Sequence, residues 1–413
     1  MTPHPTDVAG GAAPGESSGR PATIYDVARR AGVSPATVSR VMRNTVPVST
    51  GTRDRVTSAM SELRFLPNRL GVSLAEGRHA ANGIVFPDLA GPYFAEVVLG
   101  YEEAAGELDR SVIILSTHGR AAPRDKVLDL VARVDGLVVL GRAVDDELVA
   151  EVVSTGVPVV TLARPPLAGT DGVNADNASS ATALAEHLLA DGARRVVLLG
   201  DPQDSPDVAA RWVGVRAVLE SRGAASGPAA GLAACGPAAG LAAADPAAGP
   251  GSSGLPTRYS NPPGSLGSGP AATVQLVRSN GFDVAAGRGA ASALLARGTH
   301  PDAVICGNDE IALGVLLALR DAGLSAPGDV AVTGWDDVMA AQWAGLTTVR
   351  QPMRELGAVA AGLLDRRIRT PHAEHRHDLL PTELVVRTSC GHNPEHPSGP
   401  HAGHHPGHHP EEN

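Results

Sequence analysis

Apolar residues near the start of the chain recur at the three- and four-residue intervals of amphipathic helices. The first predicted helix begins after Thr23 and ends at Gly32, a residue typical of helix C-termini. The second starts with Ser34 as N-cap and Pro35 as its first residue, and the third covers about residues 49–64. This pattern predicts a small all-α bundle in which a tight turn joins the first two helices. The residues predicted to face its core are Ile24, Val27, Ala28, Ala31, Val38, Val41, Met42, Val56, Ala59, Met60 and Leu63.

From residue 82 onward, short β-rich runs alternate with longer helical stretches. Such alternation predicts parallel sheets that are covered by helices on both faces. Eight or more units exceed one ordinary open sheet, so we expect an α/β core of two doubly wound lobes. A ligand cleft is expected between the lobes or at the carboxyl ends of the strands. The predicted strands are 84–86, 112–115, 137–140, 157–162, 196–199, 274–277, 303–306 and 330–333, and examples of the predicted helices are 93–108, 178–190 and 310–322.

Three segments lack any apolar period and are rich in Gly, Pro, Ala, Ser or His. Residues 1–20 and 224–270 are predicted to be disordered, because such compositions bury too little surface to offset their ordering entropy. The octapeptide GPAAGLAA occurs twice in the second segment, at 227–234 and 236–243. The tail, residues 391–413, holds seven of the fifteen histidines. A metal-binding tail is one interpretation, but without fixed geometry a disordered tail is the simpler one.

Length and composition limit the class of protein. The 413 residues allow two to four domains, and 43% apolar residues suffice for buried cores. No apolar run approaches the ~20 residues that cross a bilayer, and the first twenty residues do not resemble a signal peptide. We therefore expect a cytoplasmic protein with no membrane partner. Cys235, Cys306 and Cys390 lie far apart without a CxxC pair, so we expect reduced cysteines and no metal site or cofactor.

The charge is unevenly distributed. Between Arg20 and Arg78 there are ten arginines and four acidic residues, a local charge of +6, whereas the whole chain carries −10. The remaining residues therefore sum to −16. A compact basic block on an acidic protein is typical of a polyanion-binding unit, although charge alone would equally fit a solvated basic face.

The second predicted helix has the chemistry of a helix that reads DNA. It follows a glycine-containing turn, the arrangement in which a helix N-terminus enters the major groove. Hydroxyl groups at that end can bind phosphates, and Arg40, one turn further, can reach guanine edges. The residues on this edge are Ser34, Pro35, Ala36, Thr37, Ser39 and Arg40.

The run TIYDVARRAGVSPATVSRV, residues 23–41, closely resembles the signature of the LacI/GalR (lactose-repressor) family of bacterial transcription regulators. The match continues through residues 48–49, 52–53 and 67–68 and into the core, to about Thr388. The resemblance implies a repressor that binds near-palindromic, double-stranded operator DNA as a homodimer. It also implies a periplasmic-binding-protein-like core controlled by a small effector, a sugar or sugar derivative. Two heads reading two half-sites would explain the dimer.

The resemblance assigns DNA contacts to individual residues. Pro35, Ala36 and Arg40 correspond to base-reading positions, and Ser34, Thr37 and Ser39 correspond to backbone contacts. Leu74 matches a leucine that the family's hinge helix inserts into the minor groove. Gly71 stands where the family commonly has alanine, which costs about 0.8–1 kcal/mol of helix propensity. Formation of this hinge helix is therefore expected to depend more on DNA binding. The alternative is that the segment is an ordinary linker. The complete predicted DNA-binding set is Ile24, Tyr25, Ser34, Pro35, Ala36, Thr37, Ser39, Arg40, Arg43, Asn68 and Leu74.

The resemblance likewise implies an effector site at the strand ends of the core. Phe94 would stack on a ligand ring, and Arg211 would bind hydroxyls or carboxylates. Ala163 replaces an aspartate that many sugar-responsive members have, and the following Arg164 could serve an anionic ligand. Asp309 could instead cap its own helix. The predicted effector-binding residues are Asp88, Tyr93, Phe94, Arg164, Arg211, Asn308, Asp309, Trp335 and Asp336.

The predicted organisation has a head, a hinge and a two-lobed core. The segments are a leader (1–20), the helix-turn-helix domain (21–66), the hinge helix (67–79), the core (80–390) and the tail (391–413), with lobe 1 at about 80–163 and 352–379 and lobe 2 at about 164–349 and 380–390.

Two other classes of protein fit the sequence less well. An enzyme is disfavoured, because Gly287-Arg-Gly289 lies near a helix start and no Walker loop, GxSxG or HExxH motif occurs. A solute-binding protein without a DNA role would fit the core, but not the basic head.

Overall fold

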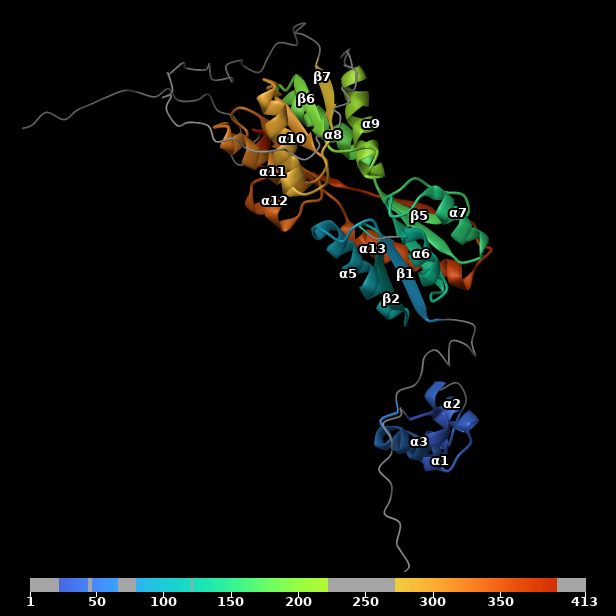
Figure 1. Cartoon of the computed structure of the whole chain (residues 1–413). Helices are drawn as coiled ribbons and strands as arrows, with labels where there is room; N and C mark the ends of the chain where they lie inside the picture. Colours follow the sequence, from blue (N-terminus) through green and yellow to red (C-terminus); the bar gives the residue numbers. More distant parts are fainter. Residues whose placement is uncertain (1–21, 44–46, 66–78, 120–121, 222–271, 392–413) are drawn as a thin grey trace, which may run out of the picture. The chain divides into compact units, whose positions relative to one another are not determined.

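The computed structural model describes residues 22–43, 47–65, 79–119, 122–221 and 272–391, and the chain forms two compact units, Met1–His79 and Ala80–Asn413 (Figure 1). We call them the head and the core. The predicted leader, most of the hinge helix, the 224–270 insertion and nearly all of the tail lie outside the described residues. No helix in the described part is long and apolar enough to cross a membrane.

The head consists of α1 (Ile24–Ala31), α2 (Pro35–Arg43) and α3 (Thr50–Glu62). The carboxylate of Asp26 accepts hydrogen bonds from the backbone nitrogen of Thr23 at 2.9 Å and from its hydroxyl at 2.6 Å, which fixes the start of α1. Gly32 ends that helix with a φ of +66°, a conformation that suits glycine. Val27, Val38 and Val56, one from each helix, are fully buried together. The predicted three-helix bundle is confirmed.

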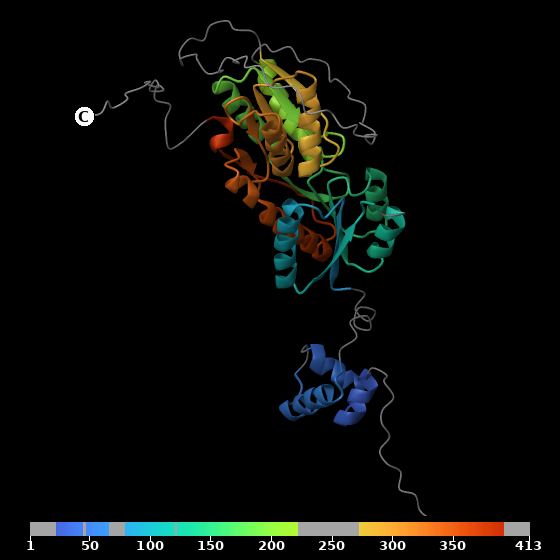
Figure 2. The ribbon, with the colours of Figure 1, turned by 60° about the vertical axis from the view of Figure 1, so that its left-hand side comes forward.

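The first lobe of the core contains a parallel sheet in the order β11-β5-β4-β3-β1-β2. Helices α5, α6, α7 and α13 cover it (Figure 2). The elements are β1 (Ala81–Phe86), α5 (Pro92–Glu107), β2 (Ser111–Ser116), α6 (Pro123–Val131), β3 (Gly136–Leu140), α7 (Asp146–Ser154), β4 (Val159–Leu162), β5 (Asp171–Ala175), α13 (Met353–Arg369) and β11 (His377–Leu380).

The second lobe contains a smaller parallel sheet in the order β7-β6-β8-β9, and β10 and β12 form an antiparallel pair. The elements are α8 (Asn177–Ala190), β6 (Arg195–Leu199), α9 (Pro206–Ser221), β7 (Thr273–Val277), α10 (Val284–Ala296), β8 (Ala303–Cys306), α11 (Asp309–Asp321), β9 (Ala331–Thr333), α12 (Met339–Trp343), β10 (Thr348–Arg350), β12 (Glu383–Val385) and the 3-10 helix η1 (Thr388–Cys390).

Successive residues of each strand face opposite helix layers. In β1, Ile84 and Phe86 pack with α5 and α13, whereas Val85 packs with α6 and α7. In β6, Leu198 packs with α8 and α9, whereas Leu199 packs with α10 and α11. Both sheets are therefore buried on both faces, which explains their nearly continuous apolar runs. The prediction of two doubly wound lobes is confirmed.

The boundary between the lobes differs from the prediction. We expected lobe 2 to begin near residue 164, but β5 pairs with β4 and belongs to the first sheet. The sequence DGVNA of β5 contains one large apolar residue, so it has no strand-like apolar run. Strands β10, β11 and β12 were missed for the same reason, because they are short and partly polar. Their position is set by pairing rather than by local pattern.

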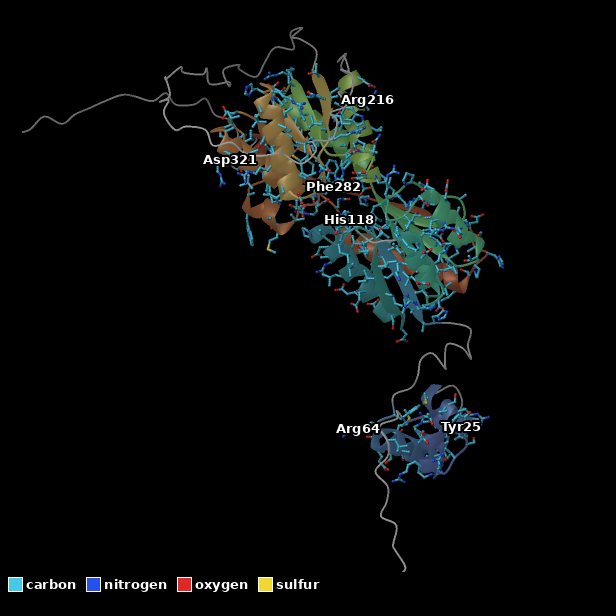
Figure 3. The ribbon with its side chains drawn as sticks, viewed as in Figure 1. Tyr25, Arg64, His118, Arg216, Phe282 and Asp321 are labelled. Atoms are coloured by element: carbon cyan, nitrogen blue, oxygen red, sulfur yellow. The ribbon has the colours of Figure 1, made fainter. Side chains whose placement is uncertain are left out.

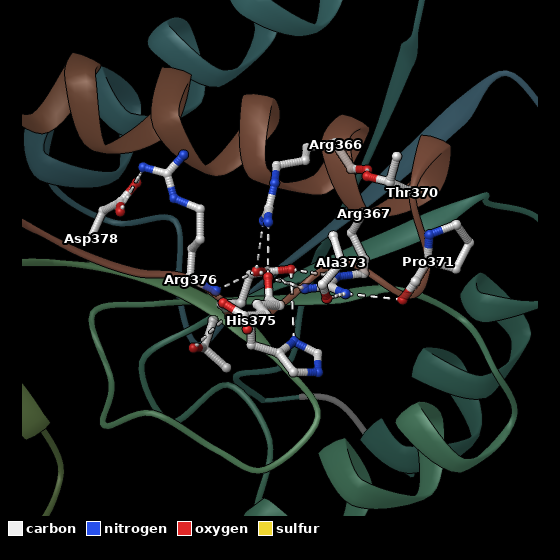
Figure 4. Close-up of polar contacts among 11 residues, drawn as sticks. Arg366, Arg367, Thr370, Pro371, Ala373, His375, Arg376 and Asp378 are labelled. Atoms are coloured by element: carbon white, nitrogen blue, oxygen red, sulfur yellow. Dashed lines mark hydrogen bonds and ion pairs between the residues drawn. The ribbon is translucent and has the colours of Figure 1, made fainter.

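Asp171, at the start of β5, fastens three segments of the first lobe. Its buried carboxylate accepts hydrogen bonds from Arg367 Nε at 2.7 Å and from the backbone nitrogen of Arg376 at 2.7 Å, with Arg366 Nη1 at 3.4 Å (Figure 4). Burial alone would raise the pKa of Asp171, but the bonds from Arg367 and Arg376 outweigh it, and the pKa lies below its ordinary value. The end of α13 and the start of β11 are thus held against β5.

Candidate functional site

The N-terminal edge of α2 is exposed on the head. Ser34 caps the helix, because its hydroxyl accepts a hydrogen bond from the backbone nitrogen of Thr37 at 3.2 Å. Ala36 and Arg40 are exposed, whereas Val38 and Val41 point into the bundle core. The helix therefore presents to solvent the edge that was predicted to face DNA, and it buries the side predicted to be core.

Arg40 carries the accessible positive charge of this edge. Within the described part of the head, its guanidinium forms no hydrogen bond or ion pair. Arg30, by contrast, pairs with Glu62 at 2.5 Å, and Arg29 lies 3.6 Å from Asp26. The charge of Arg40 is thus free to interact with a polyanion.

The remaining predicted DNA-binding residues have different surroundings. Tyr25 is 67% exposed on α1 (Figure 3), whereas Ile24 is half-buried and packs against the bundle core. Pro35, Thr37 and Ser39 are half-buried on α2. The side chain of Arg43 and all of Asn68 and Leu74 lie outside the described residues.

Arg211, on α9, is the centre of a polar cluster in the core. Its Nε donates a hydrogen bond to Asn177 Oδ1 at 2.8 Å, and its Nη1 donates to the carbonyl oxygen of Gly307. The guanidinium lies 4.4 Å from the ring centroid of Trp335, and Nη2 lies 3.9 Å from Asp207 Oδ2. These partners lie on α8, on α9 and at the carboxyl ends of β8 and β9, where ligands of parallel sheets bind.

Asp336 follows Trp335 at the end of β9 and adopts a φ of +107°. Its backbone nitrogen donates to the carbonyl oxygen of Val349 at 2.8 Å, and its Oδ1 accepts from Gln351 Nε2 at 2.5 Å. Burial raises the pKa of Asp336 well above its ordinary value, although the nearby Arg211 guanidinium opposes this shift. The strained backbone therefore holds a buried carboxyl group that resists ionisation.

Three other acidic groups in the cluster behave in the same way. Burial raises the pKa of Asp207 and Glu310, and it raises the pKa of Asp309 to about 7 despite hydrogen bonds from Thr348 and Val338. A carboxyl group that keeps its proton can donate a hydrogen bond as well as accept one. The cluster is rich in such groups, and Arg211 is the cation beside two of them, Asp207 and Asp336.

First-lobe residues reach the same cluster. Asp207 and Asp336, from the second lobe, lie close enough to Tyr93 to raise the pKa of its buried phenol further, although burial is the largest cause. A Cβ atom on Gly91 would lie 3.3 Å from Glu310 Oε1, so the start of α5 lies against the start of α11. The cluster therefore joins the two lobes. We call Tyr93, Asp207, Arg211, Glu310, Trp335 and Asp336 the polar site.

Several buried polar atoms at this end of the sheets make no hydrogen bond within the described residues. They are Tyr93 Oη, Ser279 Oγ, Glu310 Oε1, Trp335 Nε1 and Gln351 Oε1. Buried polar groups are nearly always paired with protein or water, and an unpaired group costs roughly 1–3 kcal/mol. The set offers both donors and acceptors, which suits a ligand with several hydroxyl groups.

Not all predicted effector residues meet in the polar site. Arg164 is buried but bonds to Asp146 and to the carbonyl oxygen of Val144, so its charge is engaged at the start of α7. Phe94 packs edge-on against Phe86 and Tyr93, with ring centroids 5.8 and 5.4 Å apart. Asp88 accepts a hydrogen bond from the backbone nitrogen of Ala90 within its own loop.

Asn308 and Asp309 have structural partners. Asn308, rather than Asp309, caps α11, because its Oδ1 accepts from the backbone nitrogen of Ile311 at 2.9 Å. Asp309 instead accepts from Thr348 Oγ1 at 2.6 Å and from Val338 N at 2.9 Å. It braces the segment after β9 against α11.

Sequence reasoning missed Asn177, Asp207, Glu310 and Gln351. Asp207 stands one helical turn before Arg211, a spacing that could have indicated a pair. Glu310 adjoins a predicted site residue, but nothing local distinguishes it from a solvated helix acid. Asn177 and Gln351 carry no sequence signal, because tertiary folding alone brings them to Arg211 and Asp336.

Comparisons with known proteins agree with this architecture. Residues 23–68 match the family described as bacterial regulatory proteins, lacI family. Residues 79–229 match the periplasmic binding proteins and sugar binding domain of the LacI family, and residues 267–390 match a periplasmic binding protein-like domain.

Relatives cover almost the full length of the chain. It is 30% identical to the ribose operon repressor of Escherichia coli (strain K12), over 89% of this chain and 99% of the relative. It is 29% identical to the transcriptional regulator DegA of Bacillus subtilis (strain 168), over 89% and 97%. The lac repressor dimer bound to operator and the anti-inducer ONPF has a TM-score of 0.71 and 26% identity, over 90% of this chain and 99% of that one.

The chain belongs to the LacI family of bacterial regulatory proteins. It is a DNA-binding regulator of transcription with an effector-binding core, and it is not an enzyme. The alternative of a solute-binding protein without a DNA role is therefore excluded.

Proposed function

We propose that this protein represses transcription by binding a near-palindromic operator as a homodimer, under the control of a neutral, hydroxyl-rich effector bound at the polar site. The observation that carries the proposal is the exposed N-terminal edge of α2, with the guanidinium of Arg40 available on it. The proposed place of action is the cytoplasm, at the nucleoid.

Each exposed group on α2 has a chemical counterpart on DNA. Arg40 can bind the O6 and N7 atoms of guanine, and the methyl group of Ala36 can contact the thymine methyl. Ser34 and Thr37, at the positive end of the helix, suit phosphate oxygens. The proposed contacts of Arg43, Asn68 and Leu74 rest on the sequence resemblance.

The homodimer is supported by apolar surface on the second lobe. Met339 and Trp343, one turn apart on α12, are 63% and 81% exposed. A hollow of about 560 Å³ lies on the outer side of α10 and α11, and its lining is mainly apolar. Exposed apolar surface of this kind is typical of protein interfaces. The lining residues of the hollow are Val284, Ala285, Arg288, Gly289, Ser292 and Leu317.

The chemistry of the polar site favours a sugar or sugar derivative over an anion. A carboxylate or phosphate on the effector would find one cation, Arg211, in the polar site, and it would be repelled by Asp207, Glu310 or Asp336 whenever one of them is ionised. Hydroxyl groups can accept from Arg211 and from protonated carboxyl groups, and they can donate to the unpaired acceptors. Relatives are consistent with this class: the ribose operon repressor is named for a sugar operon, and a structural neighbour with 28% identity and a TM-score of 0.57 is a CelR–cellobiose complex.

Control by the effector follows from its position. A ligand that contacts Tyr93 and Arg211 touches both lobes, so it favours one arrangement of the lobes over another. If that arrangement also changes operator affinity, the effector changes the affinity for the operator by the same factor by which the operator changes the affinity for the effector. A repressor released by its effector and one assisted by it differ only in the sign of this coupling.

A binding selection tests the DNA-binding part of the proposal. Full-length protein is incubated with random DNA duplexes, and the enriched sequences should share two inverted half-sites. Affinity for the enriched duplex should fall about 10³- to 10⁵-fold between about 50 and 200 mM salt, the behaviour of a protein with six to ten phosphate contacts. A selection without inverted repeats would contradict the dimeric-operator proposal.

A ligand panel tests the effector class. Thermal unfolding is measured with monosaccharides, disaccharides, sugar phosphates and nucleobases, because a ligand at about 100 times its Kd adds about 2.7 kcal/mol of stability. A neutral sugar should raise the Tm and change operator affinity. Stabilisation by anionic ligands alone would overturn the proposed effector chemistry while leaving the DNA-binding function intact.

A further inference from the structure

A second cluster of ligating side chains lies at the far end of α8 from the polar site. His187 stands in the last turn of α8, Asp191 follows that helix, and Cys390 lies in η1. One ligating atom from each lies within 4.8 Å of the other two. His187 is ten residues from Asn177 along α8, which corresponds to about 15 Å of helix. The cluster is therefore separate from the polar site.

The two distances from His187 to its neighbours in this cluster are close to those of tetrahedral metal coordination. His187 Nε2 lies 3.2 Å from Cys390 Sγ and 3.4 Å from Asp191 Oδ2. Around a tetrahedral zinc ion, with bonds of about 2.0–2.1 Å to nitrogen or oxygen and about 2.3 Å to sulfur, such atoms would be about 3.3–3.6 Å apart. The i, i+4 spacing of His187 and Asp191 places both on one face of the helix end. The ligating atoms of Cys390 and Asp191 lie within 4.8 Å of each other, so binding an ion would close that pair by at most about 1.3 Å.

The surroundings suit a metal-bound thiolate. Cys390 is 1% exposed; Thr347 Oγ1 lies 3.1 Å from its sulfur and can donate to it, and the thiol lies 3.6 Å from the carbonyl oxygen of Arg387. Within the described part of the chain, Asp191 Oδ2 is buried and has no hydrogen-bond partner, although His187 Nε2 lies 3.4 Å from it. A carboxylate oxygen in that position lacks the donor it ordinarily has, and a cation would replace that donor.

We propose that His187, Asp191 and Cys390 bind one divalent transition-metal ion, with zinc as the best match. A thiolate, an imidazole and a carboxylate together favour zinc over the oxygen-preferring magnesium and calcium. Three protein ligands leave the fourth position of the ion to water. The ion would fasten the C-terminal turn of the core to α8, independently of DNA and effector binding. The sequence offers no warning of this site, because Cys390 is about 200 residues from its partners.

Cobalt(II) is the first probe, because a cysteine ligand gives it a thiolate-to-metal charge-transfer band in the near ultraviolet. Reduced full-length protein should develop this band and saturate it at a stoichiometry of one ion per chain. Cys390→Ser should abolish the band, whereas the matched control Cys235→Ser should retain it. Histidines of the tail can bind cobalt but cannot produce a thiolate band. Absence of the band in the unmodified protein, or its persistence in Cys390→Ser, would overturn the proposal.

Zinc titration followed by thermal unfolding provides the second readout. Zinc should raise the Tm of the unmodified protein and of Cys235→Ser. His187→Gln and Asp191→Asn, which keep the size of each side chain, should each weaken zinc binding about 10-fold or more. If Cys390→Ser does not fold, these two variants decide the question. Equal zinc stabilisation of all variants would assign the metal to other groups and refute this site.

Discussion

The guanidinium of Arg211 lies 4.4 Å from the centre of the Trp335 ring, and both side chains are buried. A cation over a desolvated indole ring is worth about 2 kcal/mol. The contact fixes the guanidinium plane, while Asn177 and the carbonyl of Gly307 hold its edge. One residue of α9 is thereby locked to the end of β9, and the polar site, where we propose that the effector binds, is organised before a ligand arrives.

Arg211→Lys should remove effector control while preserving operator binding. Lysine cannot reproduce the planar fork of donors or the stacked geometry. Because hydrogen bonds to charged groups are worth about 1.5–3 kcal/mol, effector affinity should fall about 10- to 150-fold. Titration of the effector into a protein–operator complex measures this loss. The control is Arg216→Lys, because Arg216 lies on the same helix but bonds to the exposed Glu220; this variant should keep its response to the effector. If Arg211→Lys also responds to the effector as the unmodified protein does, Arg211 is not part of the effector site.

Arg40→Ala should reduce operator discrimination without unfolding either unit. Loss of one bidentate base contact costs about 1–3 kcal/mol, so the ratio of specific to non-specific affinity should fall about 5- to 150-fold. Competition between operator and random duplex measures the ratio. Arg29→Ala removes the same charge from an 80% exposed side chain on α1 and should leave the ratio nearly unchanged. Equal losses in both variants would indicate a purely electrostatic role for Arg40.

Asp309 should make the stability of the core depend on pH. Its pKa is about 7 in the folded protein, against an ordinary value of 3.8. The folded state then holds more protons than the unfolded state between those values, so this group's contribution to stability falls as pH rises from about 4 to about 7. Over this pH range, the contribution of Asp309 to the free energy of unfolding changes by at most about 4 kcal/mol. Denaturant unfolding measures the free energy of unfolding across this pH range, and it should vary less with pH in Asp309→Asn than in the control Asp283→Asn, a change at an exposed helix cap. The same pH dependence in both variants would contradict a raised pKa for Asp309.

Gly357 is needed for the contact between α13 and α5. A Cβ atom at this position would lie 2.1 Å from the carbonyl oxygen of Val97, which belongs to a helix backbone and cannot move alone. Gly357→Ala should therefore lower the free energy of unfolding by about 1–3 kcal/mol or more. Gly362, on the same helix, has no atom within 4 Å of such a Cβ, so Gly362→Ala should be neutral or stabilising by up to about 1 kcal/mol. Chemical denaturation compares the two, and similar stabilities would show that the helices can separate without cost.

Local patterns predicted those elements whose residues alone specify their structure. The start of α1 after Thr23 and its end at Gly32 appear in the structure as expected, because each signal acts within one helical turn. The buried strands of both sheets were predicted because parallel strands covered on both faces need apolar residues at every position. By contrast, β5 is held by Asp171 and Arg367, nearly 200 residues apart, and no local pattern marks such a pair.

The sequence by itself therefore determined the head, the two-lobed core, the exposed edge of α2 and the family, since these depend on periodicity, caps and an ordered series of matched residues. Only the tertiary structure decided which polar residues act together. It joined Arg211 to Trp335, engaged Arg164 with Asp146, and brought His187 beside Cys390. The physical reason is that a charged or ligating side chain has no period of its own, and its partner is set by the packing of the apolar elements that carry it.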